Sequence, residues 1–267
     1  MISARALTTP LVGTLAAVCF ASGANAAQVQ VTVSVENLAP TDSITFAPLR
    51  LAFHGGMFDS FDIGAAPTAA IISVAEGGSG GDWFPLLMAM DPTATPGSVL
   101  PNPAGPLLPG GTGTATFIVD SSVNPYFSFA SMVVPSNDFF IGNDDPMAYR
   151  LFDANGDLAI ISIVQQGRDI WDAGSEIHDP AAAAFVGNND LRADQNSVVA
   201  FNFAELAAFN GLPTAAGYVF DSQLTGSTDV YRISFAVAPV PEPETYALLA
   251  LGLGMIGWMG RRRLRRS

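Results

Sequence analysis

Two short segments of this sequence gather carboxylates beside aromatic residues and glycines. Residues 131–142 read SMVVPSNDFFIG, and residues 169–176 read DIWDAGSE. In each segment a strand-like run ends in a loop that carries acidic side chains. Hard cations such as calcium take about six to eight oxygen ligands from carboxylates, backbone carbonyls and water. Two neighbouring loops at one end of a domain could supply such ligands.

Strands must position these loops, and the clearest strands stand at the two ends of the domain. Residues 29–36 place valine at every second position between Gln, Thr, Ser and Glu, and residues 230–237 alternate in the same way. A period of two with one apolar face is typical of a half-buried antiparallel strand. We therefore expect the first and last strands to bracket one domain, residues 27–239.

Further strand-like runs lie between these two and are separated by clusters of Gly, Pro, Asn and Asp. Many short strands with such turns favour an all-β fold, an antiparallel β-sandwich. The runs cover residues 44–53, 115–119, 126–134, 149–152, 158–164, 197–203 and 217–220.

Three other segments have local signatures. Residues 153–157 read DANGD and predict a tight hairpin turn, because Asn-Gly tolerates the positive φ angles that such turns need. The loop lacks the glutamate that an EF-hand has at its twelfth position, where Val164 stands. Residues 77–113 have little regular pattern and are expected to form a long ordered loop or an insertion that lies over the sandwich, pinned by an apolar contact at residues 83–87. Short helices are expected at 67–74 and 203–209.

At the two acidic segments the sequence resembles the spondin N-terminal domain, a β-sandwich of extracellular matrix proteins and of bacterial secreted proteins. The family pattern Met-Val-Pro-Ser-Pro-Asp-Trp-Phe-Val-Gly is similar to residues 132–142, MVVPSNDFFIG. The family pattern Trp/Tyr-Asp-Ala-Gly-Thr-Asp is similar to residues 171–176, WDAGSE. Residues 46–54 and 61–64 also resemble the early strand and loop of the bacterial members.

The spondin resemblance implies a calcium-type metal site with Asp138, Asp172 and Glu176 as ligands. This chain departs from the family pattern at three positions: Asn137 replaces a proline, Phe139 replaces a tryptophan, and Glu176 stands where aspartate is usual. The longer side chain of Glu176 suits a flexible calcium shell better than a rigid magnesium shell. The same acids are also typical of residues that cap turns beside Gly and Ser, and this alternative stays open.

The N-terminal residues have the order of parts of a secretory signal peptide. Arg5 supplies the positive charge, an apolar run covers residues 11–21, and Ala-Asn-Ala at 24–26 supplies the small-residue cleavage site. We expect residues 1–26 to be removed after Ala26, so that they take no part in the fold.

The C-terminal residues 240–267 form a second signal. Pro-Glu-Pro at 241–243 precedes an apolar run at 246–260 and an arginine-rich end. This order resembles the PEP-CTERM sorting signal of Gram-negative bacteria, which an exosortase recognises. The apolar run is shorter than the ~20 residues of a typical membrane-spanning helix, yet with tilt and interfacial arginines it could anchor the chain transiently in the inner membrane.

Composition excludes several classes of function. Residues 27–240 carry five arginines, no lysine and 22 acidic residues, which gives a net charge of −17. So acidic a domain repels phosphates, and we therefore exclude nucleic-acid binding. The single cysteine, Cys19, lies in the expected signal peptide, and His54 and His178 are the two histidines. Thiol catalysis, disulfides and a histidine-rich zinc site are thereby excluded.

These features together predict an exported, non-enzymatic protein of the cell surface or extracellular matrix, an adhesion domain stabilised by calcium. Its partners would be an exosortase and extracellular polysaccharide or matrix components. A polysaccharide-acting hydrolase would need a pair of carboxylates, for which Asp138 and Asp172 are candidates, or a nucleophile with a base. A carbohydrate-binding module would place Trp83 or Trp171 in an exposed aromatic row.

Overall fold

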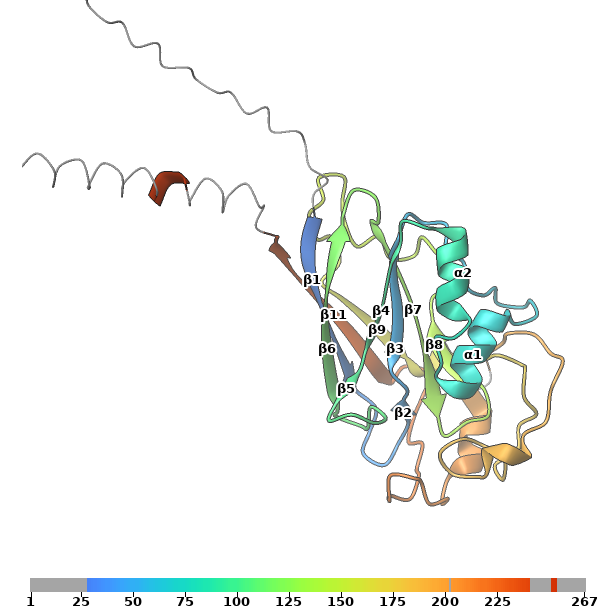
Figure 1. The fold of residues 1–267 in the computed structure, drawn as a ribbon. Helices are drawn as coiled ribbons and strands as arrows, with labels where there is room; N and C mark the ends of the chain where they lie inside the picture. Colours follow the sequence, from blue (N-terminus) through green and yellow to red (C-terminus); the bar gives the residue numbers. More distant parts are fainter. Residues whose placement is uncertain (1–27, 202, 241–250, 254–267) are drawn as a thin grey trace, which may run out of the picture.

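Two antiparallel β-sheets face each other in the computed structural model, which describes residues 28–201, 203–240 and 251–253 (Figure 1). The first sheet has the strand order β5 (Pro101–Asn102), β6 (Thr112–Asp120), β1 (Gln28–Asn37), β11 (Asp229–Pro239) and β9 (Ser162–Gln166). The second has the order β10 (Ile170–Asp172), β8 (Phe139–Gly142), β7 (Tyr126–Val134), β3 (Leu49–His54) and β4 (Thr95–Val99), and β2 (Thr45–Phe46) pairs with the end of β7. The predicted antiparallel sandwich is confirmed.

The first sheet is buried on one face only, which is why its strands alternate in sequence. Val31, Val33 and Val35 of β1 are buried in the core between the sheets, where they meet Phe127 and Phe129 of β7. The residues between those valines point outward and pair across strands, as Thr32 does with the hydroxyl of Thr116 at 3.4 Å. The alternation of valine with hydroxyl residues in β1 thus indicates that the sheet has one buried and one exposed face.

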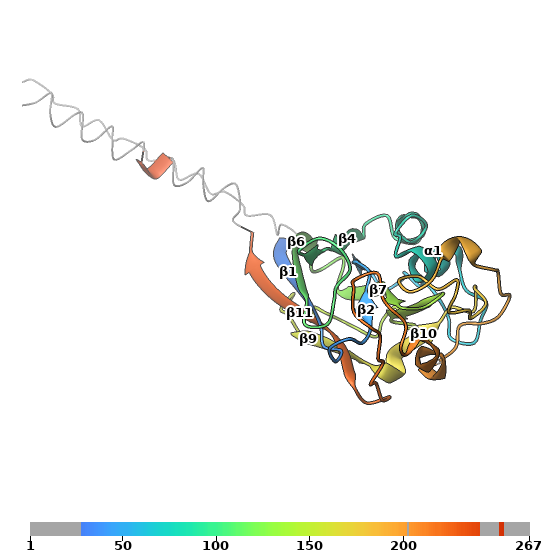
Figure 2. The ribbon, with the colours of Figure 1, turned by 90° about the horizontal axis from the view of Figure 1, so that it is seen from below.

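The second sheet is buried on both faces, because two helices cover its outer side (Figure 2). These helices are α1 (Ala69–Gly77) and α2 (Trp83–Met90). Eight of the nine residues of β7 are buried, so its sequence reads as a continuous run without alternation. A second core, with Phe58, Phe61, Trp83 and Phe140 among its members, fills the space between this sheet and the helices.

Helix α1 confirms the helix expected at 67–74 and has a recognisable cap at each end. The Thr68 hydroxyl accepts a hydrogen bond from the Ile71 N–H at 3.2 Å, which satisfies a donor of the first turn. Gly78 ends the helix in the left-handed region at φ 58°, and its N–H donates to the Val74 carbonyl.

Residues 77–113 are not the irregular loop that the sequence predicted. They contain α2, β4, β5 and the start of β6. Helix α2 reads WFPLLMAM and has no polar residue, so it offers no helical periodicity to detect. The expected apolar contact is confirmed, since the buried Trp83 ring packs edge-on against Phe58 with centroids 4.7 Å apart.

Three predicted strands are wrong, and one is displaced. Residues 149–152 and 217–220 form only isolated bridges or irregular structure, while the strand expected at 158–164 is β9. Of the strand expected at 197–203, the described residues 197–201 are irregular apart from one isolated bridge, and Phe203 begins a 3-10 helix. The predicted turn at 153–157 is confirmed, because the Asp153 N–H donates to the Asp157 carbonyl at 3.0 Å. Three 3-10 helices complete the fold of the described residues, η1 (Gly167–Asp169), η2 (Asn189–Leu191) and η3 (Phe203–Phe209). The last lies where a helix was expected.

The first and last strands are neighbours in the centre of one sheet. Val29 of β1 lies opposite Pro239 of β11, so both described ends of the domain meet at one end of the sandwich (Figure 1). The expected signal peptide, and the expected membrane segment apart from residues 251–253, lie outside the described residues. Within the part of the chain that is described, no helix is long and apolar enough to cross a membrane.

Candidate functional site

The two acidic segments meet at the end of the second sheet that is opposite to Val29 and Pro239. Asp138 comes immediately before β8, and Asp172 is the last residue of β10, which pairs with β8. The antiparallel register places Asp172 opposite Phe139. Neighbouring strands therefore bring the two segments together, as the sequence predicted.

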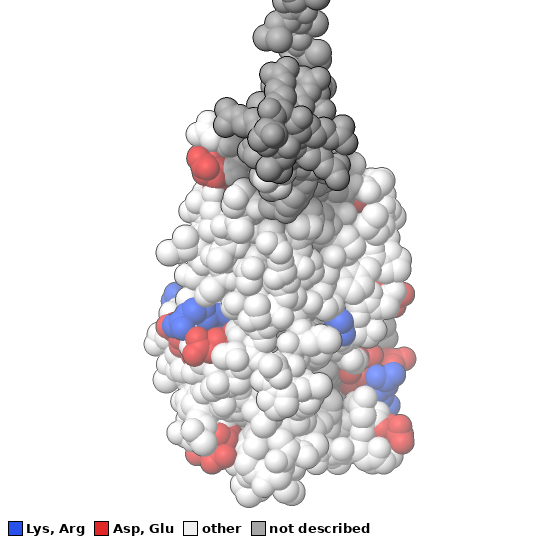
Figure 3. Space-filling view, turned by 60° about the vertical axis from the view of Figure 1, so that its left-hand side comes forward, with Lys and Arg blue, Asp and Glu red and all other residues white. Residues whose placement is uncertain are grey.

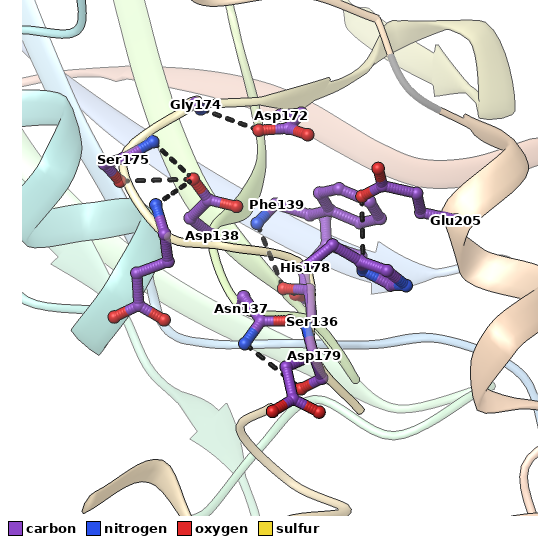
Figure 4. A network of polar contacts seen from close by, with 12 residues as sticks. Ser136, Asn137, Asp138, Phe139, Asp172, Gly174, Ser175, His178, Asp179 and Glu205 are labelled. Atoms are coloured by element: carbon purple, nitrogen blue, oxygen red, sulfur yellow. Dashed lines mark hydrogen bonds and ion pairs between the residues drawn. The ribbon is translucent and has the colours of Figure 1, made fainter. Parts of the chain in front are cut away.

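Asp138 is buried and fastens the loop that follows β10. Its Oδ2 accepts hydrogen bonds from the Ser175 N–H at 2.7 Å, the Ser175 hydroxyl at 3.2 Å and the Glu176 N–H at 3.0 Å (Figure 4). The pKa of Asp138 is raised to about 6, because burial and then the negative charge of Asp172 outweigh the three donors, which act to lower it. Asp138 is thus a structural acceptor that holds two distant segments together.

Asp172 shapes the start of the same loop. Its Oδ1 accepts a hydrogen bond from the Gly174 N–H at 2.6 Å, an Asx-type turn. Gly174 has a φ of 71°, and a Cβ at that position would lie 2.7 Å from the Val198 carbonyl oxygen. The backbone of Asp172 also pairs in both directions with Ala200. The turn-capping interpretation of this residue is therefore realised in the structure.

Glu176 is buried and faces an arginine that the sequence analysis did not single out. Its Oε1 lies 3.4 Å from Arg192 Nη1, and the same nitrogen lies 3.5 Å from Oε2 of Glu76 on α1. The pKa of Glu176 is raised to about 7, first by burial and then by the nearby Glu76, while Arg192 opposes the shift. Arg192 therefore links helix α1 to the loop after β10.

Asn137 and His178 stabilise the rim of this site. The Asp179 N–H donates to Asn137 Oδ1 at 3.1 Å, and the Asn137 amide donates to the Asp179 carbonyl at 3.4 Å. His178 Nδ1 lies 3.2 Å from Oε2 of Glu205 on η3 (Figure 4). The asparagine that departs from the spondin pattern thus pairs the two loops through its amide group.

The three predicted ligands do not form a metal shell in this arrangement. Asp138 uses Oδ2 for three protein donors, and Glu176 is paired with Arg192. Among the described residues, no group of three or more His, Cys, Asp or Glu side chains is placed to hold a metal ion. For calcium to use all three residues, Glu176 would have to leave Arg192. Calcium binding therefore stays a prediction.

A pocket of about 490 Å³ lies beside this site. Ile72 and Glu76 of α1 line one part of it, and Ser175 and residues 194–197 line another. Glu76 thus belongs both to the pocket and to the ion pair with Arg192. The pocket is polar enough to hold water or a small polar ligand next to the acidic loops.

The fold also brings a histidine beside a serine, a pair that the sequence did not reveal. His54 Nδ1 accepts a hydrogen bond from the Gly56 N–H at 3.0 Å, so the proton of the neutral ring lies on Nε2, which donates to the Ser128 hydroxyl at 2.9 Å. Both side chains are buried, and Asn143 donates to the same hydroxyl. A general base would need a free lone pair on Nε2, so this pair is arranged as a structural network.

The aromatic residues named in the sequence analysis have different environments. Trp83 is fully buried, whereas Trp171 is half-buried and packs edge-on against Phe201, which is 46 % exposed. Phe201 in turn stacks on Phe203, with centroids 5.9 Å apart and an interplanar angle of 14°. These three rings form a partly exposed aromatic row next to Asp172.

The comparisons with known proteins bear on the C-terminal signal. The family model described as the PEP-CTERM protein-sorting motif matches residues 239–263. A search of curated proteins finds no match, and no family match supports the spondin resemblance. The motif is the one that an exosortase recognises in its substrates. The molecule is therefore an exported β-sandwich protein, and it carries the sorting motif of exosortase substrates at residues 239–263.

Proposed function

We propose that this chain is a non-catalytic protein of the cell surface or extracellular matrix, which an exosortase cuts near residues 240–245. The observation that carries the proposal is the sorting motif, which begins at Pro239, the last residue of β11. The processed product is then the sandwich alone. We extend the proposal to a spondin-like adhesion domain, which is supported by the two facing antiparallel sheets and by the meeting of the two acidic motifs at one end.

The position of the acidic loops supports a role in contact with the surroundings. They lie at the end of the sandwich opposite to Val29 and Pro239 (Figure 1). While the C-terminal segment anchors the chain, these loops face away from the membrane. The side of the first sheet carries few charges (Figure 3), and on it Glu36 and Arg232 neutralise each other at 2.7 Å. The loops are therefore the better candidate for charged or polar partners.

Processing can be tested in the producing cells by mass spectrometry of the protein from medium and envelope. We expect an N-terminus at Ala27 and a C-terminus between 240 and 245. Replacing Pro241, Glu242 and Pro243 together by alanine should leave the C-terminal segment attached and the protein in the inner membrane. Normal maturation and release of this variant would refute the sorting part of the proposal.

Adhesion is tested separately with the purified mature domain. We expect residues 27–240 to bind envelope or matrix material from cells that lack the protein, and not to bind liposomes of anionic lipid, which a domain with a charge of −17 repels. Absence of binding to any envelope or matrix fraction would refute the adhesive role while leaving the sorting part intact.

Carbohydrate binding is a second candidate function, because the row of Trp171, Phe201 and Phe203 is partly exposed. Aromatic rings offer apolar faces on which the C–H faces of sugars can stack. Affinity electrophoresis in polysaccharide gels should show retardation that Phe201→Ala abolishes. Leu191→Ala, at an exposed apolar residue outside the row, is the matched control. Equal retardation of both variants would remove this candidate.

A further inference from the structure

The last strand of the domain, β11, has neighbouring strands on both sides along part of its length and on one side only near its end. Up to Ser234, residues of β11 pair with β1 on one side and with β9 on the other, since Ser234 lies opposite both Ser34 and Ser162. The Phe235 N–H still donates to the Ile161 carbonyl at 2.9 Å. Beyond it, residues 236–239 pair with β1 alone.

These four residues, the strap 236–239, also bury little surface. All four are exposed, whereas Tyr231 and Ile233 earlier in β11 are completely buried. Pro239 has no N–H to donate to the ladder. Local opening has a low cost where side chains are exposed and few hydrogen bonds are lost. Release of the strap therefore costs far less than opening the rest of β11.

Release of the strap would leave the remainder of the sheet in place. The partner segment of β1, residues 29–32, pairs on its other side with residues 116–119 of β6. It keeps these contacts when residues 236–239 leave. The core residues of β1, Val31 and Val33 among them, stay buried against the second sheet.

The short spacing between β11 and the apolar run makes release of the strap 236–239 relevant to processing. Six residues, 240–245, separate β11 from the apolar run that begins at Tyr246. Fully extended, they span at most about 20 Å. Within this distance a membrane enzyme has to reach the Pro-Glu-Pro segment while the folded sandwich stands beside it. Four more residues would lengthen the segment by roughly 14 Å.

We propose that the strap 236–239 detaches from β1 when an exosortase binds this chain, so that the enzyme contacts an extended segment that begins at Ala236. The binding surface for the exosortase is then longer than the Pro-Glu-Pro box and includes the end of the folded domain. This inference rests on the proposed processing near residues 240–245.

A disulfide between β1 and the strap tests it in the full-length chain. Gln30→Cys with Ala238→Cys joins a directly opposed pair in the strap, and Ser34→Cys with Ser234→Cys joins a pair in the two-sided part of β11. The pairs are four residues apart, so they have the same position in the alternation of the ladder. The domain has no cysteine of its own, and exported proteins form disulfides readily.

Maturation is followed by pulse-labelling of the precursor in the producing cells, with and without reductant. We expect the 30–238 disulfide to slow cleavage at least tenfold and the 34–234 disulfide to change it less than twofold, with reductant restoring the first variant. Inserting ten Gly and Ser residues after Pro239 should restore cleavage of the 30–238 variant without reductant. Equal cleavage rates for the two disulfide variants, or no rescue by the insertion, would refute the proposal that the strap detaches. Failure of the unmodified chain to be cut would instead overturn the proposed processing.

Discussion

Asp138 accepts a hydrogen bond from the backbone N–H of Ser175 at 2.7 Å, across 37 positions of sequence. The same oxygen accepts the Glu176 N–H and the Ser175 hydroxyl. One buried carboxylate thus joins the start of β8 to the loop after β10. The two segments that the sequence marked as a candidate site are held together by the very residue predicted to be a metal ligand.

The first prediction concerns this carboxylate. Asp138→Ala leaves the N–H groups of Ser175 and Glu176 buried without an acceptor, and each such group costs about 1–3 kcal/mol. We expect the free energy of unfolding to fall by about 2–4 kcal/mol in urea titrations at pH 7.5. Asp138→Asn keeps an accepting oxygen and should lose less than half as much. The exposed-turn variant Asp157→Ala should stay within about 0.5 kcal/mol of wild type. Equal stability of the Ala and Asn variants would contradict the role of Asp138 as acceptor.

The sequence predicted the framework wherever burial follows a simple period. β1 and β11 alternate because one face of the first sheet is exposed, and β7 was predicted at its observed bounds as a strand-like run. Helix α2 was missed, because its eight apolar residues have no polar face. The run 217–220 has strand composition, but it pairs only through the isolated bridge of Pro213 with Val219. Composition alone does not provide a partner strand.

The candidate site was predictable in part. The meeting of the two acidic segments was expected from their shared pattern, a strand that ends in a loop with carboxylates. The pairing of Glu176 with Arg192 and Glu76 did not, because these residues are brought together by α1 and by the irregular segment around η2. The contact of His54 with Ser128 spans 74 positions between neighbouring strands. The sequence drew attention to His54 only as one of two histidines, and it did not indicate Ser128 as its partner.

The second prediction concerns the pH dependence due to Glu176. Its pKa is raised to about 7 in the folded chain, mainly by burial and then by Glu76, so the folded state binds this proton more tightly than the unfolded state does. The contribution to stability is complete below a pH of about 4.5, the ordinary pKa of the Glu176 carboxyl, and is lost as pH rises through 7. Urea unfolding of wild type should therefore lose more stability between pH 5.5 and pH 8 than that of Glu176→Gln. His54 and Asp138 titrate in both proteins, and because the charges of Asp138 and Glu176 interact, the difference between the two pH profiles measures Glu176 together with its effect on Asp138. Parallel pH profiles of the two proteins would contradict the assignment.

The third prediction concerns His54, whose contribution to stability is lost as pH falls, whereas that of Glu176 is lost as pH rises. Burial lowers its pKa to about 4, even though the negative charge of Asp91 acts in the opposite direction. The stability that the neutral ring contributes is complete above the unfolded pKa of about 6.5 and is lost as pH falls toward 4. His54→Gln should be less stable than wild type at pH 7.5, and the difference in unfolding free energy should narrow steadily between pH 6.5 and pH 4. A constant difference across this range would show that the His54 ring is not buried in its neutral form.

The fourth prediction concerns calcium. If calcium binds only the folded domain, it adds RT ln(1 + [L]/Kd), about 2.7 kcal/mol at ~100 times Kd. We expect millimolar calcium to raise the unfolding temperature of residues 27–240, most strongly at low salt, where the −17 charge is least screened. Asp172→Asn keeps the size of the side chain and removes its charge, so it should abolish most of the shift. Asp157→Asn, in the turn at 153–157, is the control and should keep the shift.

The ion pair of Arg192 makes the calcium experiment specific to the predicted ligands. Arg192 Nη1 lies 3.4 Å from Glu176 and 3.5 Å from Glu76, and a cation that uses Glu176 has to compete with this guanidinium. Arg192→Gln leaves the two carboxylates without their positive partner, and their mutual repulsion then destabilises the metal-free domain. We therefore expect Arg192→Gln to lower the unfolding temperature in chelator and to increase the calcium-dependent rise above that of wild type. The distant variant Arg232→Gln breaks the exposed pair with Glu36 on the first sheet and should leave the calcium response unchanged. The calcium prediction is wrong if millimolar calcium changes the unfolding temperature of neither wild type nor Arg192→Gln relative to chelator. These carboxylates would then only hold the loops together.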